Sequence, residues 1–306
     1  MKMPSQLLPA FALLLVGACT ARADFDLTAY QQDVEEWRAD RAAYLVGPNG
    51  FVNIVGLYWL EKDVYRIGSA SGNDIVFPEG AAPSIGELRV TAEGVVLAVE
   101  PGVEVSKDGA PLPEILMVDD TQENPVTVTH GSFAWLIILR DGRYAMRLRD
   151  YEHPDIATFG PMQWFDIDPA YRLTATLRPW DEPRVLNVGT TIEGLGFNPV
   201  SPGKLAFEID GAEHELEAYW SGERLYIIFA DRTTGRQTYP AGRYMYLTAP
   251  DEEGKTIIDF NKAFSPPCAY NDFATCPVAS PRNRLSVSIE AGEKYDPEVH
   301  KTGALD

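Results

Sequence analysis

The chain has 306 residues, of which 45% are hydrophobic and 23% are charged, as in a globular protein with an ordinary core. Its 26 basic and 45 acidic residues leave a net charge of −19. Because so acidic a surface repels phosphate backbones and anionic headgroups, we expect no binding to nucleic acid. The charge is interpreted as a solubility surface.

The first eighteen residues have the pattern of an export signal. Lys2 supplies a positive charge, and residues 7–16 are apolar but too short to span a bilayer. The stretch ends in Val-Gly-Ala before Cys19, which resembles the bacterial lipobox. The resemblance implies a lipoprotein signal peptide over residues 1–18 and a lipid on Cys19. This lipid would anchor the protein to a membrane, which is the predicted partner. The alternative is a secretory signal cut after Ala21 or Ala23.

The residue after the lipobox cysteine indicates which of the two membranes would hold the protein. Thr20 stands where an aspartate marks inner-membrane retention in Gram-negative lipoproteins. The sequence therefore predicts a lipid-anchored cell-envelope protein that faces the periplasm, at the outer membrane. Cys268 and Cys276 remain as an even pair in a compartment that permits disulfides.

Residues 19–47 are predicted to be an anchor linker followed by one amphipathic helix. Thr28 and Gln31 match a capping box, and Gly47 with the next proline ends the helical pattern. Apolar residues follow at roughly helical spacing, namely Tyr30, Val34, Trp37, Tyr44 and Leu45. We expect this stripe to pack against the main body.

The rest of the chain is predicted to be mainly β, as two packed antiparallel regions. Residues 48–150 contain short strands that are separated by glycine, proline and aspartate turns about every ten residues, as in a β-sandwich. Asp141 and Gly142 predict a two-residue hairpin turn. A domain boundary is predicted near residue 150, followed by a second β domain over residues 151–306. Within this domain, residues 231–236 are predicted to form a turn in which Gly235 can adopt a positive φ.

The pattern I-G-x-x-x-x-N-D-I-V-F near residue 67 resembles forkhead-associated domains, which bind phosphothreonine. The residues that would read the phosphate are missing. Ser69 stands in place of the arginine, and Ser84 is not followed by Arg-x-x-His. Without a cation a phosphate loses its main attraction, so we expect the β-sandwich scaffold without phosphopeptide binding.

The last third of the chain carries a specific signature, which begins F-x-D-x-T-x-G and continues through D-F-N-K-A-F, P-P-C-A-Y, N-R-L and A-G-E-K. These motifs, with G-L-Y-W-L at residues 56–60 and R-L-R-D at residues 147–150, are similar to the bacterial and archaeal family catalogued as domain of unknown function 1684. The similarity covers nearly the whole mature chain, and the family name implies no activity.

Two cysteines lie within the signature. Cys268 and Cys276 enclose seven residues. A disulfide would restrict the unfolded chain by about 2–3 kcal/mol in the loop-entropy account. The alternative is a reactive thiol, with Cys268 as nucleophile, which requires a neighbouring base or cation. No histidine lies near either cysteine in sequence, so we expect no metal site.

The acids of the signature are the other candidates for chemistry. Asp259 lies among apolar residues, and a desolvated carboxylate must be paired or have a perturbed pKa. It is either a catalytic acid or base, or a structural group that pairs with Arg243 or makes hydrogen bonds that hold the loop. Functional residues gather on loops of this kind. The predicted ligand-binding residues are Asp231, Thr233, Tyr239, Arg243, Asn261, Asn283 and Glu293.

Common enzyme motifs are absent from the sequence. It contains no glycine-rich phosphate loop, no G-x-S-x-G and no H-E-x-x-H, which disfavours nucleotide enzymes, α/β-hydrolases and zincins. We expect no cofactor. The first hypothesis is binding of an unknown small molecule or envelope partner through residues 231–243 and 259–293. The alternative is a hydrolase or transferase that uses Asp259 or Cys268, with Arg243 orienting an anionic substrate.

Overall fold

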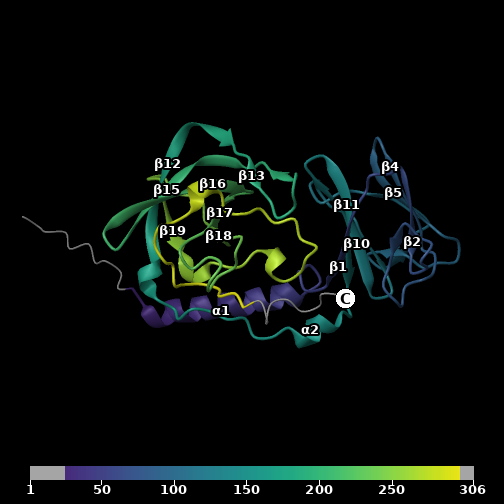
Figure 1. Ribbon diagram of the computed structural model, residues 1–306, viewed down its shortest axis with the longest axis horizontal. Helices are drawn as coiled ribbons and strands as arrows, with labels where there is room; N and C mark the ends of the chain where they lie inside the picture. The colour runs from purple at the N-terminus through teal and green to yellow at the C-terminus, as the bar shows by residue number, and fades with distance from the viewer. Residues whose placement is uncertain (1–24, 297–306) are drawn as a thin grey trace, which may run out of the picture.

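The computed structural model describes residues 25–296. Cys19 and the predicted signal peptide lie outside the described residues. The fold is mainly β with antiparallel sheets and an N-terminal helix, as predicted. Figure 1 shows two β regions side by side, with the helix α1 beneath the second. No helix in residues 25–296 is long and apolar enough to cross a bilayer.

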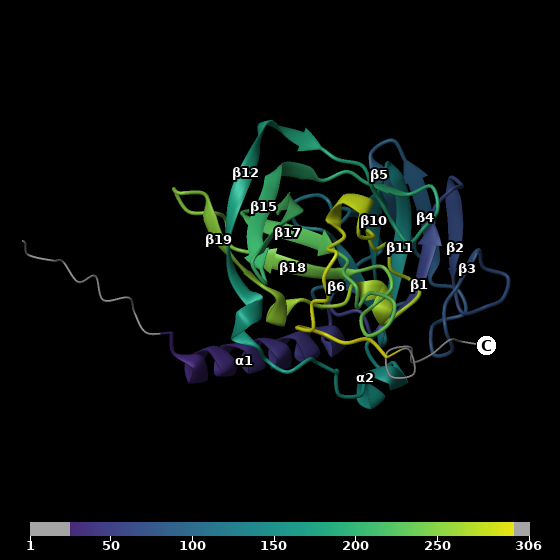
Figure 2. The same cartoon turned by 60° about the vertical axis from the view of Figure 1, so that its left-hand side comes forward.

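Helix α1 spans Leu27–Val46. Its N-cap is Asp26, whose carboxylate accepts the backbone N–H of Ala29 at 3.0 Å. The prediction of Thr28 as N-cap was therefore wrong, because the helix begins before it. One face of α1 is buried through Tyr30, Val34, Arg38 and Leu45. Figures 1 and 2 show that α1 runs along the bottom of the second β region toward β1.

The first β region is a sandwich of two sheets. The six-stranded sheet has the order β1 (Ile54–Trp59), β11 (Arg143–Asp150), β10 (Phe133–Arg140), β9 (Thr127–His130), β6 (Ser106–Lys107), β7 (Ala110–Pro111). The five-stranded sheet has the order β3 (Ile75–Val76), β2 (Val64–Gly68), β4 (Gly86–Thr91), β5 (Gly94–Val99), β8 (Glu114–Met117). The two sheets share one core that includes Leu88, Leu97 and Trp135. The resemblance to forkhead-associated domains stays a prediction.

Strand β11 has two different faces. Met146 and Leu148 point into the core of the sandwich. Because side chains alternate along a strand, Arg147 and Arg149 point to the opposite face. Both arginines are nevertheless buried, at 9% and 6% exposure. The outer face of this sheet is therefore covered by the rest of the chain.

The second β region is built on one six-stranded sheet. Its order is β18 (Arg243–Leu247), β17 (Arg224–Phe229), β16 (Ala212–Ser221), β15 (Val200–Ile209), β12 (Arg172–Val185), β19 (Lys255–Asp259). One face packs a core that includes Leu205, Ile227 and Phe260. The other face carries charged residues at the β12–β15–β16 end and tyrosines at the β17–β18 end.

Short elements complete the second region. They are a two-stranded ribbon and five short helices: β13 (Val188–Gly189), β14 (Gly196–Phe197), α2 (Pro154–Thr158), η1 (Pro169–Tyr171), η2 (Phe260–Lys262), η3 (Pro267–Ala269) and η4 (Pro281–Asn283). We call residues 260–296 the C-terminal segment. It winds past α1 and the edge of β18, where Phe264 bridges to Tyr244. The domain boundary near residue 150 stays a prediction.

Candidate ligand-binding site

Asp231 and Arg243 form a buried ion pair at the ends of β17 and β18. The Nη2 of Arg243 lies 2.7 Å from Oδ2 of Asp231, and both side chains are fully buried. Arg243 also donates to the carbonyl oxygens of Ile289 and Ala291. Burial lowers the pKa of Arg243, and the attraction of Asp231 opposes that effect. Asp259 was predicted either to pair with Arg243 or to make hydrogen bonds, and the pairing with Arg243 was wrong, because Asp231 occupies that place.

The loop between β17 and β18 closes around this pair. The backbone N–H and the hydroxyl of Thr233 both donate to Oδ1 of Asp231, each at 2.6 Å. The hydroxyl of Tyr239 donates to the carbonyl of Cys268 at 2.9 Å and so ties the loop to the C-terminal segment. Gly235 has the predicted positive φ of 78°. The loop is held by its own polar groups.

Asp259 and Asn261 fasten α1 to the second β region. The hydroxyl of Tyr30 donates to Oδ1 of Asp259 at 3.0 Å, and Nδ2 of Asn261 donates to the Tyr30 oxygen at 2.8 Å. Asn261 also accepts the backbone N–H of Asp168 at 3.0 Å. Desolvation raises the pKa of Asp259, partly opposed by these hydrogen bonds. This carboxyl group therefore links a helix to a strand.

Asn283 and Glu293 are also buried and hydrogen-bonded within the protein. Asn283 bridges two strands, since Nδ2 donates to the carbonyl oxygens of Glu217 and Ile228, each at 2.9 Å. Glu293 accepts the backbone N–H of Ser265 at 2.9 Å and the hydroxyl of Tyr270. Both side chains are fully buried. Their hydrogen bonds hold the C-terminal segment against the sheet.

The seven predicted ligand-binding residues thus form several separate polar clusters, and none of them lines the large cavity described below. Their role in ligand binding stays a prediction. In residues 25–296, no group of three or more histidine, cysteine, aspartate or glutamate side chains is arranged to hold a metal ion.

Cys268 and Cys276 are neighbouring buried free thiols. The backbone N–H of Cys268 donates to Sγ of Cys276 at 3.1 Å. A hydrogen bond from the Cys276 thiol lowers the pKa of Cys268, whereas burial raises the pKa of Cys276. Neighbouring thiols are compatible with a later disulfide, which stays a prediction. Of the two, Cys276 lines the cavity.

A cavity of about 860 Å³ lies between the two β regions. This volume suits a drug-sized ligand. Its walls come from α1, the β10–β11 hairpin, the face of β16–β18 that carries tyrosines, the β13–β14 ribbon and the C-terminal segment. The lining includes four arginines, eight aromatic residues and a single acid: Arg41, Arg140, Arg147 and Arg224; Tyr44, Phe51, Phe197, Trp220, Tyr226, Tyr244, Tyr246 and Phe264; and Asp141.

Arg147 is the most unusual of these residues. In residues 25–296 its guanidinium makes no ion pair, and its buried Nε has no hydrogen-bond partner. Burial, together with the nearby charges of Arg140 and Arg149, lowers the pKa of Arg147 to about 10, although the charge of Asp120 partly opposes the shift. An arginine of this pKa is still a cation at neutral pH. The cavity wall therefore holds a buried positive charge that the described part of the protein does not neutralise.

The other arginines of the cavity differ in their partners. Arg140 is ion-paired with Asp120 at 2.6 Å. Arg41 donates to the carbonyl of Ser265 at 3.1 Å, and its buried Nε has no partner in the described chain. Its guanidinium lies 4.3 Å from the centre of the Phe264 ring, and that of Arg224 lies 4.6 Å from the Tyr246 ring. Within residues 25–296, Arg41 and Arg224 therefore contact aromatic rings, and in the case of Arg41 a carbonyl oxygen, but no carboxylate.

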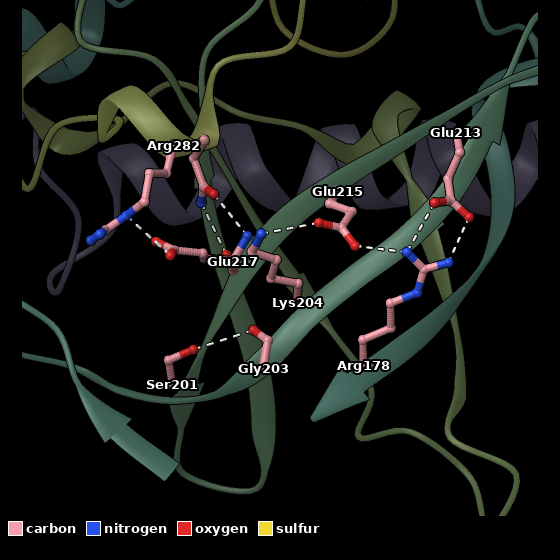
Figure 3. A network of polar contacts seen from close by, with 9 residues as sticks. Arg178, Ser201, Gly203, Lys204, Glu213, Glu215, Glu217 and Arg282 are labelled. Atoms are coloured by element: carbon pink, nitrogen blue, oxygen red, sulfur yellow. Dashed lines mark hydrogen bonds and ion pairs between the residues drawn. The ribbon is translucent and has the colours of Figure 1, made fainter. Parts of the chain in front are cut away.

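The β12–β15–β16 end of the same sheet face has the opposite character. We call Arg178, Lys204, Glu213 and Glu215 the charged face, and Figure 3 shows them in a ladder across the strands. Arg178 contacts Glu213 at 2.6 Å and Glu215 at 2.7 Å, and Lys204 contacts Glu215 at 3.0 Å. Every cation of the charged face is paired with a carboxylate.

Sequence reasoning did not identify the cavity. Arg147 was noted as part of R-L-R-D at residues 147–150 but was not assigned a role. A signal was nevertheless present, since arginines at positions 147 and 149 alternate with Met146 and Leu148 on a predicted strand. That alternation places both arginines on one face. Nothing in the sequence says that this face is buried.

Comparisons with known proteins identify a family. The family described as "Protein of unknown function (DUF1684)" matches residues 157–294. An uncharacterized protein of Haloarcula marismortui, whose structure was solved by NMR in solution, is similar at 32% identity over 47% of this chain and 81% of that chain, with a TM-score of 0.39. Among curated proteins no match was found.

Proposed function

The chain belongs to the family of proteins of unknown function DUF1684, a name that carries no activity, and we propose that it is a binding protein whose cavity holds a small organic anion. The predicted loop of residues 259–293 contributes to the cavity through Phe264, Pro267 and Cys276. The loop of residues 231–243 does not line it. The proposal therefore keeps binding as the function and moves the site to the space between the two β regions.

The single observation that carries the proposal is the unneutralised guanidinium of Arg147. A buried cation costs free energy unless a counter-charge and hydrogen bonds compensate it. Among residues 25–296, Asp141 is the only acidic residue that lines the cavity. A carboxylate, phosphate or sulfonate on a ligand supplies the missing partner and accepts bidentate hydrogen bonds from a guanidinium.

The test is a binding titration by calorimetry with 2-naphthoate and its neutral amide. Arg147→Gln should weaken binding of 2-naphthoate by roughly 10–100-fold, since a hydrogen bond to a charged group contributes about 1.5–3 kcal/mol. Binding of the amide should be the same in both proteins. Arg178→Gln is the matched control, because this arginine is paired on the charged face. Equal affinity for 2-naphthoate in wild type and Arg147→Gln contradicts the proposal.

The cellular location is a separate part of the proposal. We propose that lipid on Cys19 anchors the protein in the cell envelope, facing the periplasm at the outer membrane. Support comes from the lipobox pattern and from the short distance in sequence between Cys19 and the start of α1 at Leu27. Cys19→Ala should move the protein from the membrane to the soluble periplasmic fraction. A wild-type protein that is already soluble after fractionation contradicts the anchor.

Thiol chemistry is a second candidate function, favoured by the contact between Cys268 and Cys276, of which Cys276 lines the cavity. It would be a hydrolase or transferase with Cys268 as nucleophile, and the lowered pKa of that thiol supports it. Alkylation with iodoacetamide, with and without reductant, is the test. Two thiols that react only after reduction support the disulfide and oppose the enzyme, whereas fast reaction at Cys268 in the untreated protein supports the enzyme.

A further inference from the structure

We infer that the ligand of the cavity carries a flat aromatic ring together with its acidic group, so that aryl carboxylates, sulfonates and phosphates are its chemical class. The inference rests on the proposed function, because it concerns the same cavity. It draws on observations that are independent of Arg147. These are the exposure, the stacking and the cation contacts of the aromatic wall.

Three aromatic side chains are exposed in this cavity. Tyr44 and Tyr246 are each 46% exposed and Trp220 is 37% exposed, and all three line the same space. They come from α1, β16 and β18, which are far apart in sequence. Aromatic surface gathered in one concave place marks a binding site more strongly than single exposed rings do.

The rings of the wall are held in fixed positions. Tyr246 stacks on Tyr226, with ring centres 4.9 Å apart and planes 27° apart, and on Phe264, at 6.0 Å and 21°. Tyr244 meets the edges of Tyr226 and Phe264. Strand pairing fixes these positions, since Tyr226 is opposite Tyr246 in the β17–β18 ladder. A preformed aromatic wall binds a ring at little cost in side-chain entropy.

Cations lie next to this wall. The guanidinium of Arg224 lies over Tyr246, and that of Arg41 lies over Phe264. Arg147 belongs to β11 and lines the cavity from the first β region. An aromatic body against Trp220 and the exposed part of Tyr246, with an acidic substituent that reaches Arg147, contacts both the rings and the cations. A saturated acid satisfies the cations but gains less from the rings, because stacking requires a flat face with a π-system.

The experiment measures selectivity. The dissociation constants of 2-naphthoate and of its saturated analogue, decahydro-2-naphthoate, are determined for wild type, Tyr246→Leu and Tyr246→Phe. Wild type should bind 2-naphthoate more tightly. Tyr246→Leu should reduce the preference by about 3- to 10-fold. Tyr246→Phe keeps the ring and should keep the preference.

The preference is a ratio of two affinities, so a partly misfolded variant does not change it. Trp220→Leu is a second variant at an exposed position and should also reduce the preference. Equal affinity of wild type for the two acids, or an unchanged preference in both leucine variants, overturns the inference. If Arg147→Gln still weakens both acids in that case, the proposed function stands. If Arg147→Gln weakens neither acid, the proposed function fails and the inference fails with it.

Discussion

The charged face and the cavity surround their arginines in opposite ways. On the charged face, Arg178 contacts two glutamates, and the hydrogen bond to Glu213 followed by that to Glu215 raises its pKa. In the cavity beyond the tyrosine-bearing end, Arg147 contacts no carboxylate among residues 25–296, and burial lowers its pKa. The exposed arginine is neutralised and the buried arginine is not.

This difference is the reverse of what stability alone favours. Water already solvates an exposed cation, so its ion pairs contribute little. A buried cation needs a partner far more. The ion pair between Asp231 and Arg243 shows that the fold can supply a buried partner. Its absence at Arg147 among residues 25–296 is what the proposed binding of an anion explains.

The largest expected effect is the loss of the buried pair. Arg243→Met leaves Asp231 as a buried charge without its cation. We expect the free energy of unfolding to fall by about 3–5 kcal/mol, as when one member of a buried pair is removed. Urea denaturation followed by circular dichroism measures the change.

The matched control is the double variant Asp231→Asn with Arg243→Met, which removes both charges. It should recover part of the loss, because no unpaired charge remains. A fall of less than about 1 kcal/mol in the single variant would mean that water reaches the pair and that the site is open.

The second effect should have the opposite sign. Arg147→Met replaces an unneutralised buried cation by an apolar side chain of similar length. We expect the protein without ligand to keep its stability or gain about 1–2 kcal/mol, while affinity for 2-naphthoate falls. Thermal unfolding and calorimetric titration of one preparation measure both quantities.

A variant that gains stability and loses affinity shows that the residue serves ligand binding, whereas a residue that stabilises the fold would lose stability. Arg147→Lys is the control that keeps the charge and loses the planar fork, so it should retain part of the affinity. If Arg147→Met is instead destabilised by more than about 1 kcal/mol, the guanidinium supports the fold and the contrast with Arg243 disappears.

Local patterns in the sequence predict much of the fold. Asp141 and Gly142 both have positive φ, at 49° and 74°, as a two-residue hairpin requires. Strands β15 and β16 were not predicted, although Phe207 and Ile209 alternate with Glu208 and Asp210, and Gly211 marks their turn. The strand pattern was therefore present in the sequence, but the many charged residues of the outward face made it look like a loop.

The candidate site was harder to predict than the strands that carry it. Unusual residues such as Asn283 and Glu293 drew attention to the C-terminal segment, where they hold backbone in place. A cavity arises from the docking of segments that are distant in sequence, here α1 with β11 and β18. Whether an arginine is neutralised depends on where the fold places every acid, and a linear pattern does not contain that information.

A smaller effect, which depends on pH, is expected at Asp259. Desolvation raises the pKa of this carboxyl group in the folded state. The folded protein therefore holds the proton more tightly than the unfolded chain, and stability is lost as the pH rises through the folded pKa. Asp259→Asn removes this loss and should be more stable than wild type at pH 7, by no more than about 1 kcal/mol.

The advantage of Asp259→Asn should disappear toward pH 3–4, roughly the ordinary pKa of an aspartate, because both side chains are then neutral. Melting temperatures between pH 3 and pH 8 test the sign. An advantage that grows as the pH falls would mean that the ionised carboxylate is the stabilising form, held by Tyr30 and Asn261.

The smallest effect is expected on the charged face. Arg178→Gln removes the contacts with Glu213 and Glu215, but all three side chains are already solvated, at 51%, 60% and 32% exposure. The melting temperature in physiological salt should be unchanged within error, and any difference at low salt should vanish by 1 M salt, where charges are screened over about 3 Å. A salt-independent loss would show that the ladder aligns β12, β15 and β16. The charged face would then support the fold in the way the Asp231–Arg243 pair does, and Arg147 would be the exception among the three arginines.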